Sequence, residues 1–283
     1  MLSPAWPAPA KLNLFLHIIG QRDDGYHLLQ TVFQFIQLQD VIDFTILDSN
    51  DVHRSSSMHG VDAENDLVVR AARLLKEKTG CRLGVDIQVT KQIPEGGGLG
   101  GGSSDAATTL VALNELWKTG LSTEELAKMG LSLGADVPIF IHAHAAWAEG
   151  VGESFTPVEP EESWYLVIYP GCNVPTAEVF NADDLTRNTP AITIRDFLER
   201  GGNNDCENVV RNSYQEIAKA LDWLAEFAPA KLTGTGACLF AAFADEQQAN
   251  TVAQQLPVSW QGFVVKGMNK SPLLERLMGE QSR

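Results

Sequence analysis

The sequence contains few cysteines and few basic residues for a chain of 283 residues. The four cysteines, Cys81, Cys172, Cys206 and Cys238, lie far apart and form no CxxC pair, which argues against a metal cluster and a disulfide framework. We interpret each as a small buried apolar residue in a protein of a reducing compartment. The 36 acidic residues outnumber the 21 basic ones and give a net charge of −15. This charge disfavours nucleic acid and anionic membranes as partners.

Long hydrophobic runs, a leader segment and repeats are also lacking. No apolar run approaches the roughly 20 residues that span a bilayer. The first residues do not combine a basic start with a long apolar stretch, as a signal peptide does. No repeat with a period of roughly 20–50 residues is found. We therefore expect a cytoplasmic protein that has no membrane partner.

The residues that are present predict a globular protein in which strands and helices alternate. Hydrophobic residues make up 44% of the chain and charged residues 20%, enough for a sizeable core. We predict strands at residues 11–18, 31–36, 41–47, 85–93, 164–170 and 262–267, with strand segments at 232–243 and a short strand within 134–143. We predict helices at residues 66–78, 103–117, 207–227 and 245–256 and after Ser122, and a loop at 48–63. Alternation at 11–18 predicts a half-buried strand.

Residues 150–162 are rich in glycine, proline and acidic residues, which is typical of a boundary between domains. The length of the chain fits two domains or one large one. We therefore predict an α+β protein with two lobes, residues 1–158 and residues 159–283.

A glycine-rich loop separates the predicted strand at 85–93 from the helix that follows. Six of the seven residues from Gly96 to Gly102 are glycine, so the backbone can approach a ligand closely and direct several N–H groups at it. No Lys-Ser/Thr pair follows, so this is not a Walker A loop, and a flexible hinge is the alternative. We predict a phosphate site, with Ser103 and Ser104 as helix caps that also reach a phosphate or a hydrated magnesium ion. We explain Asp105 by the helix dipole alone.

Three other features have both a structural and a chemical interpretation. A second glycine segment, residues 232–237, either marks a bulge or brings the backbone close to the first loop or a substrate. Lys11 either keeps an exposed edge strand from pairing with another chain or offsets negative charge that develops in a reaction. Asp136 precedes Val-Pro and either starts a turn or accepts a proton from an alcohol during phosphoryl transfer. Sequence spacing does not show whether Lys11 and Asp136 meet.

Three segments resemble, in order, the three motifs of the GHMP small-molecule kinases: PAKLNLFL at 9–16, PEGGGLGGGSSDAA at 94–107 and LTGTGACLF at 232–240. GQRDDGYHLLQT, SLGADVPIF, PTAEVF and NDCE extend the resemblance nearly from end to end. It implies a first lobe like ribosomal protein S5 domain 2, a ferredoxin-like second lobe, and a site between them. It also implies that ATP donates a phosphoryl group, that Asp136 is the base and that Lys11 orients the acceptor hydroxyl.

The same resemblance implies how ATP is bound. The residues around the triphosphate would be Pro94, Gly96, Gly97, Gly98, Leu99, Gly100, Gly101, Gly102, Ser103 and Ser104. At a position that contacts adenine, the family usually has Asn where this chain has Asp66. A carboxylate accepts hydrogen bonds but does not donate them. Either adenine is bound through different hydrogen bonds here, or Asn65 makes the contact in place of Asp66. Magnesium is expected with ATP, with Ser104 or Glu153 as candidate ligands.

The four additional segments, GQRDDGYHLLQT, SLGADVPIF, PTAEVF and NDCE, resemble kinases of this family whose substrate is a cytidine-diphosphate sugar alcohol, and so imply such a substrate. Tyr26 and Phe180 would stack on the base, His27 would pair with its edge, and Asn13 would bind the sugar-alcohol end or its phosphates. Further substrate contacts would come from Thr176, Gly234, Thr235 and Gly236. The structural alternatives are a hairpin turn with an exposed aromatic for Tyr26 and His27, and core packing for Phe180. The functional alternatives are a homoserine, mevalonate or sugar kinase, and a nucleotide-binding relative without catalysis. The chain would act as a monomer or homodimer.

Overall fold

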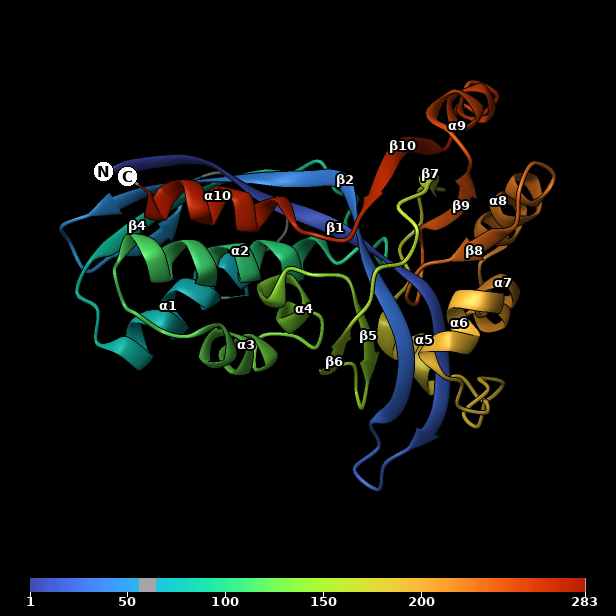
Figure 1. The fold of residues 1–283 in the computed structure, drawn as a ribbon, viewed down its shortest axis with the longest axis horizontal. Helices are drawn as coiled ribbons and strands as arrows, with labels where there is room; N and C mark the ends of the chain where they lie inside the picture. Colours follow the sequence, from blue (N-terminus) through green and yellow to red (C-terminus); the bar gives the residue numbers. More distant parts are fainter. Residues whose placement is uncertain (56–64, 283) are drawn as a thin grey trace.

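The computed structural model describes residues 1–55 and 65–282 and has two lobes joined by long strands (Figure 1). Strands β1 (Leu2–Gln21) and β2 (His27–Leu47) form an antiparallel ribbon that crosses both lobes. The turn between them has positive φ at Gly25 (89°), as the Asp-Gly pair predicts. Residues 11–18 are buried on both faces, so the prediction of a half-buried strand was wrong. Leu12, Leu14 and Phe15 are buried in one hydrophobic cluster, and Leu16 and Ile18 are buried in a second cluster with residues of the second lobe.

The sheet has the strand order β3-β4-β2-β10-β7-β9-β8. It begins in the first lobe and passes through β10 into the second. The remaining strands are β3 (Val52–Arg54), β4 (Gly84–Thr90), β5 (Ala146–Glu149), β6 (Ser154–Pro157), β7 (Trp164–Tyr169), β8 (Ala230–Leu232), β9 (Leu239–Phe243) and β10 (Gln261–Met268). β2 pairs with β5, β10 and β4 in turn along its length. The predicted strands at 31–36 and 41–47 are therefore one strand, because the polar residues between them stay paired with β1.

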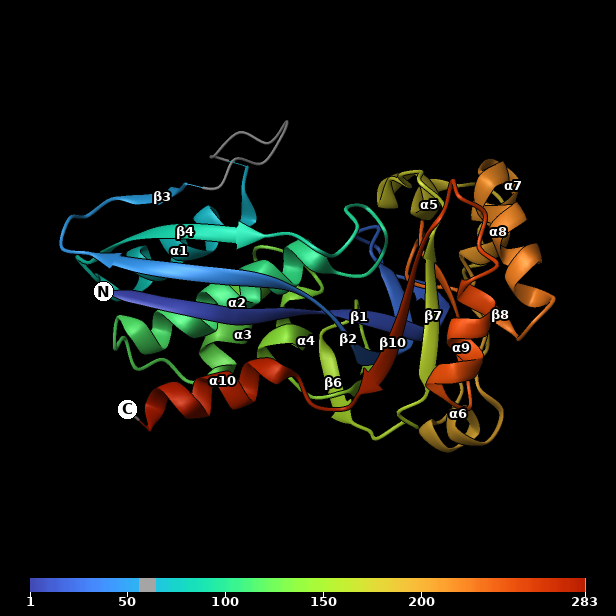
Figure 2. The same ribbon diagram turned by 90° about the horizontal axis from the view of Figure 1, so that it is seen from above.

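Four helices cover one face of the sheet in the first lobe: α1 (Leu67–Thr79), α2 (Gly101–Leu116), α3 (Thr123–Leu131) and α4 (Val137–His142). The last helix, α10 (Pro272–Gln281), contacts β1. Figure 2 shows it beside the other helices of this lobe. Its Leu273 is buried in the hydrophobic core of the first lobe. The Cζ atom of Arg276 lies 4.3 Å from the centroid of the Trp6 ring. The second lobe carries α5 (Thr176–Asn181), α6 (Ile194–Arg200), α7 (Glu207–Ser213), α8 (Gln215–Ala225) and α9 (Glu246–Ala253).

Several predicted elements are confirmed at their ends. Helix α1 ends at Gly80, which has φ of 70°, as a glycine stop predicts. The capping box at the start of α3 joins Ser122 and Glu125 reciprocally. The predicted strands at 164–170 and 262–267 appear as β7 and β10, and the helix at 245–256 appears as α9.

Three predicted elements were wrong. The segment 134–143 forms helix α4, because Pro138 near its start favours the helical φ and Ala143 caps its end with φ of 59°. The predicted helix at 207–227 is two helices, because Tyr214 has an extended backbone (φ −127°, ψ 93°) and its hydroxyl donates to Glu178. The predicted loop at 48–63 includes strand β3, and its residues 56–63 lie outside the described residues.

Candidate active site

A cavity of about 780 Å³ lies between the lobes, beside the glycine loop. It is lined by β1, the β1–β2 turn, the glycine loop, the α3–α4 connection, α5 and the second glycine segment. The predicted site residues that line it are Lys11, Asn13, Tyr26, His27, Pro94, residues 96–102, Ser103, Asp136, Thr176, Phe180, Gly234 and Thr235. Five predicted residues, Asn65, Asp66, Ser104, Glu153 and Gly236, are described but do not line it.

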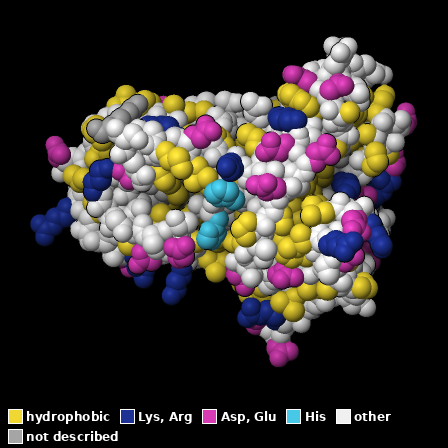
Figure 3. All heavy atoms as spheres, in the orientation of Figure 1, with side chains coloured by type: hydrophobic (Ala, Val, Ile, Leu, Met, Phe, Trp, Pro, Cys, Tyr) yellow, Lys and Arg dark blue, Asp and Glu magenta, His cyan; other side chains and the backbone are white. Residues whose placement is uncertain are grey.

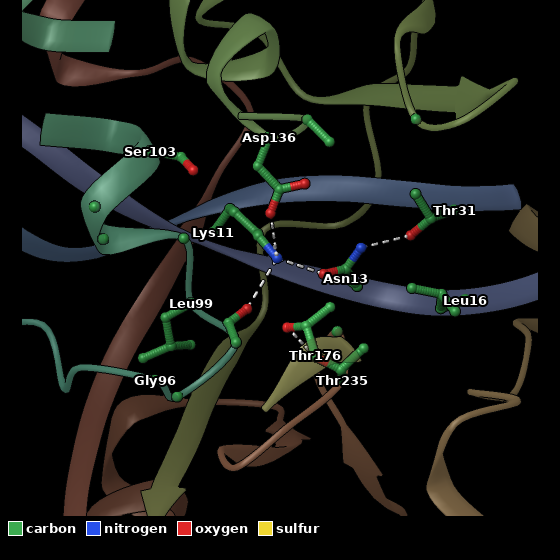
Figure 4. Close-up of a pocket in the computed structure, with 18 of the residues that line it drawn as sticks. Lys11, Asn13, Leu16, Thr31, Gly96, Leu99, Ser103, Asp136, Thr176 and Thr235 are labelled. Carbon is green, nitrogen blue, oxygen red and sulfur yellow. Dashed lines mark hydrogen bonds and ion pairs between the residues drawn. The ribbon is translucent and has the colours of Figure 1, made fainter. Parts of the chain in front are cut away.

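Lys11 and Asp136 meet in this cavity (Figure 4). Lys11 lies in the middle of β1, and its Nζ is 3.4 Å from Asp136 Oδ2. The same Nζ donates to Asn13 Oδ1 at 2.6 Å and to the Gly98 carbonyl at 2.8 Å. An ammonium has three donors and no acceptor, so these three oxygens hold the Lys11 Nζ in place. The Asp136 carboxylate starts α4 and remains 37% exposed, whereas the Lys11 side chain is 3% exposed. Asp136 is therefore accessible to a hydroxyl from the cavity.

The glycine loop is held against the second glycine segment. Backbone N–H groups of Ala237 and Cys238 donate to the carbonyls of Gly96 and Gly97. A Cβ on Gly97 would lie 2.6 Å from the buried Cys238 Sγ. Gly100 has φ of 76°, and a Cβ there would lie 2.7 Å from the Phe140 ring. Close packing therefore requires glycine at both positions, which favours a cradle for a ligand over a flexible hinge.

The serines after the loop do not cap α2. The helix starts at Gly101, with Gly100 as its N-cap, so Ser103 and Ser104 lie inside its first turn. Ser103 lines the cavity beside the loop (Figure 4). Ser104 is fully buried, and its hydroxyl has no hydrogen-bond partner among the described residues. Neighbouring residues on a helix point about 100° apart, which explains why Ser103 faces the cavity and Ser104 does not.

Asp105 belongs to a buried ionic cluster that the sequence did not indicate. Lys91 Nζ donates to Asp105 Oδ2 at 2.8 Å and to Asp40 Oδ2 at 2.5 Å. The other Asp40 oxygen accepts the backbone N–H groups of Gln92 and Ile93, which lead into the glycine loop. Burial raises the pKa of Asp105 to about 7, although the Lys91 charge opposes this rise. The explanation by the helix dipole alone was wrong, because Asp105 is packed inside the lobe.

The far end of the cavity is lined by aromatic side chains. The His27 and Phe180 rings stack at 5.1 Å with an interplanar angle of 21°. Tyr26, in the turn before β2, is 64% exposed. The hydroxyls of Thr176 and Thr235 are hydrogen-bonded to each other at 3.0 Å. Asn13 Nδ2 donates to Thr31 Oγ1, so this amide is held from both ends.

The predicted adenine residues lie at the start of α1. Asp66 caps the helix by accepting from the Val68 N–H, and it pairs with Arg54 at 2.6 Å. Its carboxylate is 7% exposed, whereas Asn65 is exposed. Of the two, Asn65 is therefore free to meet a ligand, and Leu67 on the same helix lines the cavity.

The candidate metal ligands are few. Among the described residues no group of three or more His, Cys, Asp or Glu side chains could hold a metal ion. Glu153 accepts the Val151 N–H at 2.6 Å and so stabilises its own turn. Ser104 lies outside the cavity lining, which leaves Ser103 as the serine that faces it. A magnesium ion here would take most of its ligands from phosphates and water, as this ion commonly does.

The surface adds two observations. On the face of the molecule drawn in Figure 3, Lys and Arg side chains are scattered among Asp and Glu side chains and are not gathered in one patch. Across the described residues, every helix is too short or too polar to cross a bilayer.

Two family models match the chain, GHMP kinases N terminal domain over residues 66–144 and GHMP kinases C terminal over residues 186–260. A crystal structure of mevalonate kinase, 16% identical and with a TM-score of 0.69 over 95% of this chain and all of that one, shares the fold. The two lobes and the cavity between them thus define a GHMP kinase.

Closer relatives narrow this class. The 4-diphosphocytidyl-2-C-methyl-D-erythritol kinase of Alkalilimnicola ehrlichii is 56% identical over 98% of this chain and 95% of its own length. That of Nitrosococcus oceani is also 56% identical, over 96% and 97%. A crystal structure of a kinase of the same name is 30% identical, with a TM-score of 0.81 over 95% of this chain and 99% of that one. The chain belongs to the family of 4-diphosphocytidyl-2-C-methyl-D-erythritol kinases.

Proposed function

We propose that this protein transfers the γ-phosphoryl group of ATP to the 2-hydroxyl of 4-diphosphocytidyl-2-C-methyl-D-erythritol, in the non-mevalonate route to isoprenoid precursors. The contact between Lys11 and Asp136 at the cavity wall carries the proposal, because it joins a fixed cation to an accessible carboxylate. The family of the chain supports the choice of substrate.

In the proposed reaction the substrate hydroxyl lies beside Asp136, which accepts its proton as the oxygen attacks the γ-phosphorus. A new O–P bond forms, and the bond between the γ-phosphorus and the bridging oxygen of ADP breaks. Lys11 holds the attacking oxygen and offsets the negative charge that develops on it. Its bonds to Asn13 and Gly98 fix its position before the substrate binds.

ATP would lie with its phosphates against the glycine loop, where the free N–H groups at the start of α2 favour negative charge. A magnesium ion bound with ATP would supply positive charge that offsets the negative charge of the phosphates. Ser103, which faces the cavity, would hold the ion or a phosphate. The cytidine end would lie near Tyr26, His27 and Phe180. We further propose that the protein acts in the cytoplasm, as a monomer or homodimer.

The test is ADP release with ATP, magnesium and the cytidine substrate, beside homoserine, mevalonate and galactose. We expect turnover with the cytidine substrate alone. We expect Asp136→Asn to lower kcat by about 10²–10⁴-fold, the usual contribution of a general base. Asp245→Asn is the matched control, because Asp245 caps α9 outside the cavity and Asn is an equally good cap. Turnover of another alcohol would refute the substrate, and an unimpaired Asp136→Asn enzyme would refute the base.

A further inference from the structure

Arg187 connects two walls of the aromatic end of the cavity. It follows α5 in the chain, and its Nε donates to His27 Nε2, at the start of β2, at 3.1 Å. Its Nη2 donates to the carbonyls of Phe180 at 3.0 Å and Ala182 at 2.8 Å. Its Nη1 donates to the Leu185 carbonyl at 3.2 Å. All three guanidinium nitrogens therefore have partners, and these partners come from α5, from the segment that follows it and from the start of β2.

These contacts determine the protonation of His27. A guanidinium donates hydrogen bonds and does not accept them, so His27 Nε2 must be the acceptor. A histidine that accepts at Nε2 is neutral and carries its proton on Nδ1. Burial, and after it the charge of Arg187, lowers the pKa of His27, which also favours the neutral ring. With Nε2 occupied, Nδ1–H is the polar group that the side chain of His27 can offer to a ligand.

The same arginine holds the backbone of Phe180, whose ring stacks on His27. Helix α5 has six residues, and the carbonyls at the end of a helix have no partner inside it. Arg187 supplies donors to Phe180 and to the C-cap residue Ala182, where a positive charge also favours the helix dipole. Phe180 and His27, which stack at 5.1 Å, are thus held by one side chain.

We propose that Arg187 is a positioning residue that sets the base specificity of the site by holding His27 as the Nδ1–H tautomer. This inference rests on the proposed function, in which His27 meets the edge of the cytosine. A fixed N–H donor pairs with N3 of cytosine, which is an acceptor. It opposes N3–H of uracil, which is a donor. A histidine free to change tautomer would accept from uracil as readily as it donates to cytosine.

The first test needs no variant. We expect the ¹⁵N NMR spectrum of the free wild-type protein at pH 7.5 to show His27 neutral and protonated on Nδ1. An Nε2–H tautomer or an imidazolium would overturn the proposal, even if the enzyme turns over the cytidine substrate. Absence of that turnover would refute the proposed function instead, so the two failures are distinguishable.

The second test compares kcat/KM for the cytidine substrate and its uridine analogue. We expect Arg187→Met to reduce the preference for cytidine by on the order of tenfold or more, because the wrong base no longer meets a fixed donor. We expect KM for the cytidine substrate to rise, with kcat and KM for ATP nearly unchanged. Arg195→Met is the control, because Arg195 also donates through Nε, but to Glu199 on the surface. An unchanged cytidine preference in folded Arg187→Met protein would overturn the proposal.

Discussion

Replacing Asp105 by Asn should change how stability depends on pH. Asp105 is 4% exposed, and its pKa rises from 3.8 to about 7 on folding. A carboxyl whose pKa is raised by folding stabilises the protein below its unfolded pKa, and this contribution is lost as the pH rises through the folded pKa. The window therefore runs from about pH 4 to about pH 7.

The size of the effect follows from the shift. Each pH unit inside the window changes the free energy of unfolding by about 1.4 kcal/mol, so the full change is about 4 kcal/mol. Asparagine does not titrate and removes this slope. It also buries an N–H where Asp105 Oδ1 has no partner among the described residues, which costs about 1–3 kcal/mol at every pH. The free energy of unfolding of the variant is thus lowered by a constant amount at every pH and lacks the pH dependence that Asp105 gives the wild type.

The assay is urea unfolding of both proteins at several pH values between 5 and 8. We expect the stability of wild type minus that of Asp105→Asn to fall as the pH rises to about 7. Asp196→Asn is the control. Hydrogen bonds from Thr193 lower the pKa of Asp196, so its window lies below about pH 4 and its difference curve should be flat. A flat or rising curve for Asp105→Asn would show that the cluster keeps Asp105 ionised.

Two further changes probe the loop and the fold. Gly97→Ala places a methyl group 2.6 Å from Cys238 Sγ; overpacking of this kind costs about 1–3 kcal/mol, and we expect KM for ATP to rise. Adding Cys238→Ala should restore KM, and strictly additive effects of the two changes would refute the clash. Ser122→Ala removes the cap of α3 and should lower the free energy of unfolding by about 1 kcal/mol with kcat unchanged; chemical unfolding and steady-state kinetics measure both.

Local sequence patterns predicted the elements whose ends are fixed by local chemistry. The glycine stop of α1 and the capping box of α3 depend on residues within one turn of each other. Patterns failed where tertiary contacts decide. Residues 37–40 look like a break between strands, yet β1 pairs with Gln39 and Asp40 and keeps β2 continuous. Apolar residues 137–141 look like a strand, yet they are buried as a short helix.

The candidate site was predictable only where motifs marked it. Lys11 and Asp136 are far apart in sequence, and the family resemblance, not their spacing, predicted that they share a site. Lys91 and Arg187 were missed because each acts on a distant partner, Asp40 at 51 residues and His27 at 160. Neither lies in a motif. A single sequence has no local signal for such pairs.

The return of α10 to the first lobe closes a long excursion of the chain through the second lobe, where it adds β7 to β10 to the far end of the β1–β2 ribbon. After β6 the chain runs through the second lobe, comes back along β10, and ends in the first lobe, where it also begins (Figure 1). Leu273 of α10 completes the first core, and Arg276 covers Trp6. During synthesis the ribosome therefore releases the whole second lobe before the first can close. A circular permutant that links the two ends and opens in a second-lobe loop would reverse this order of completion.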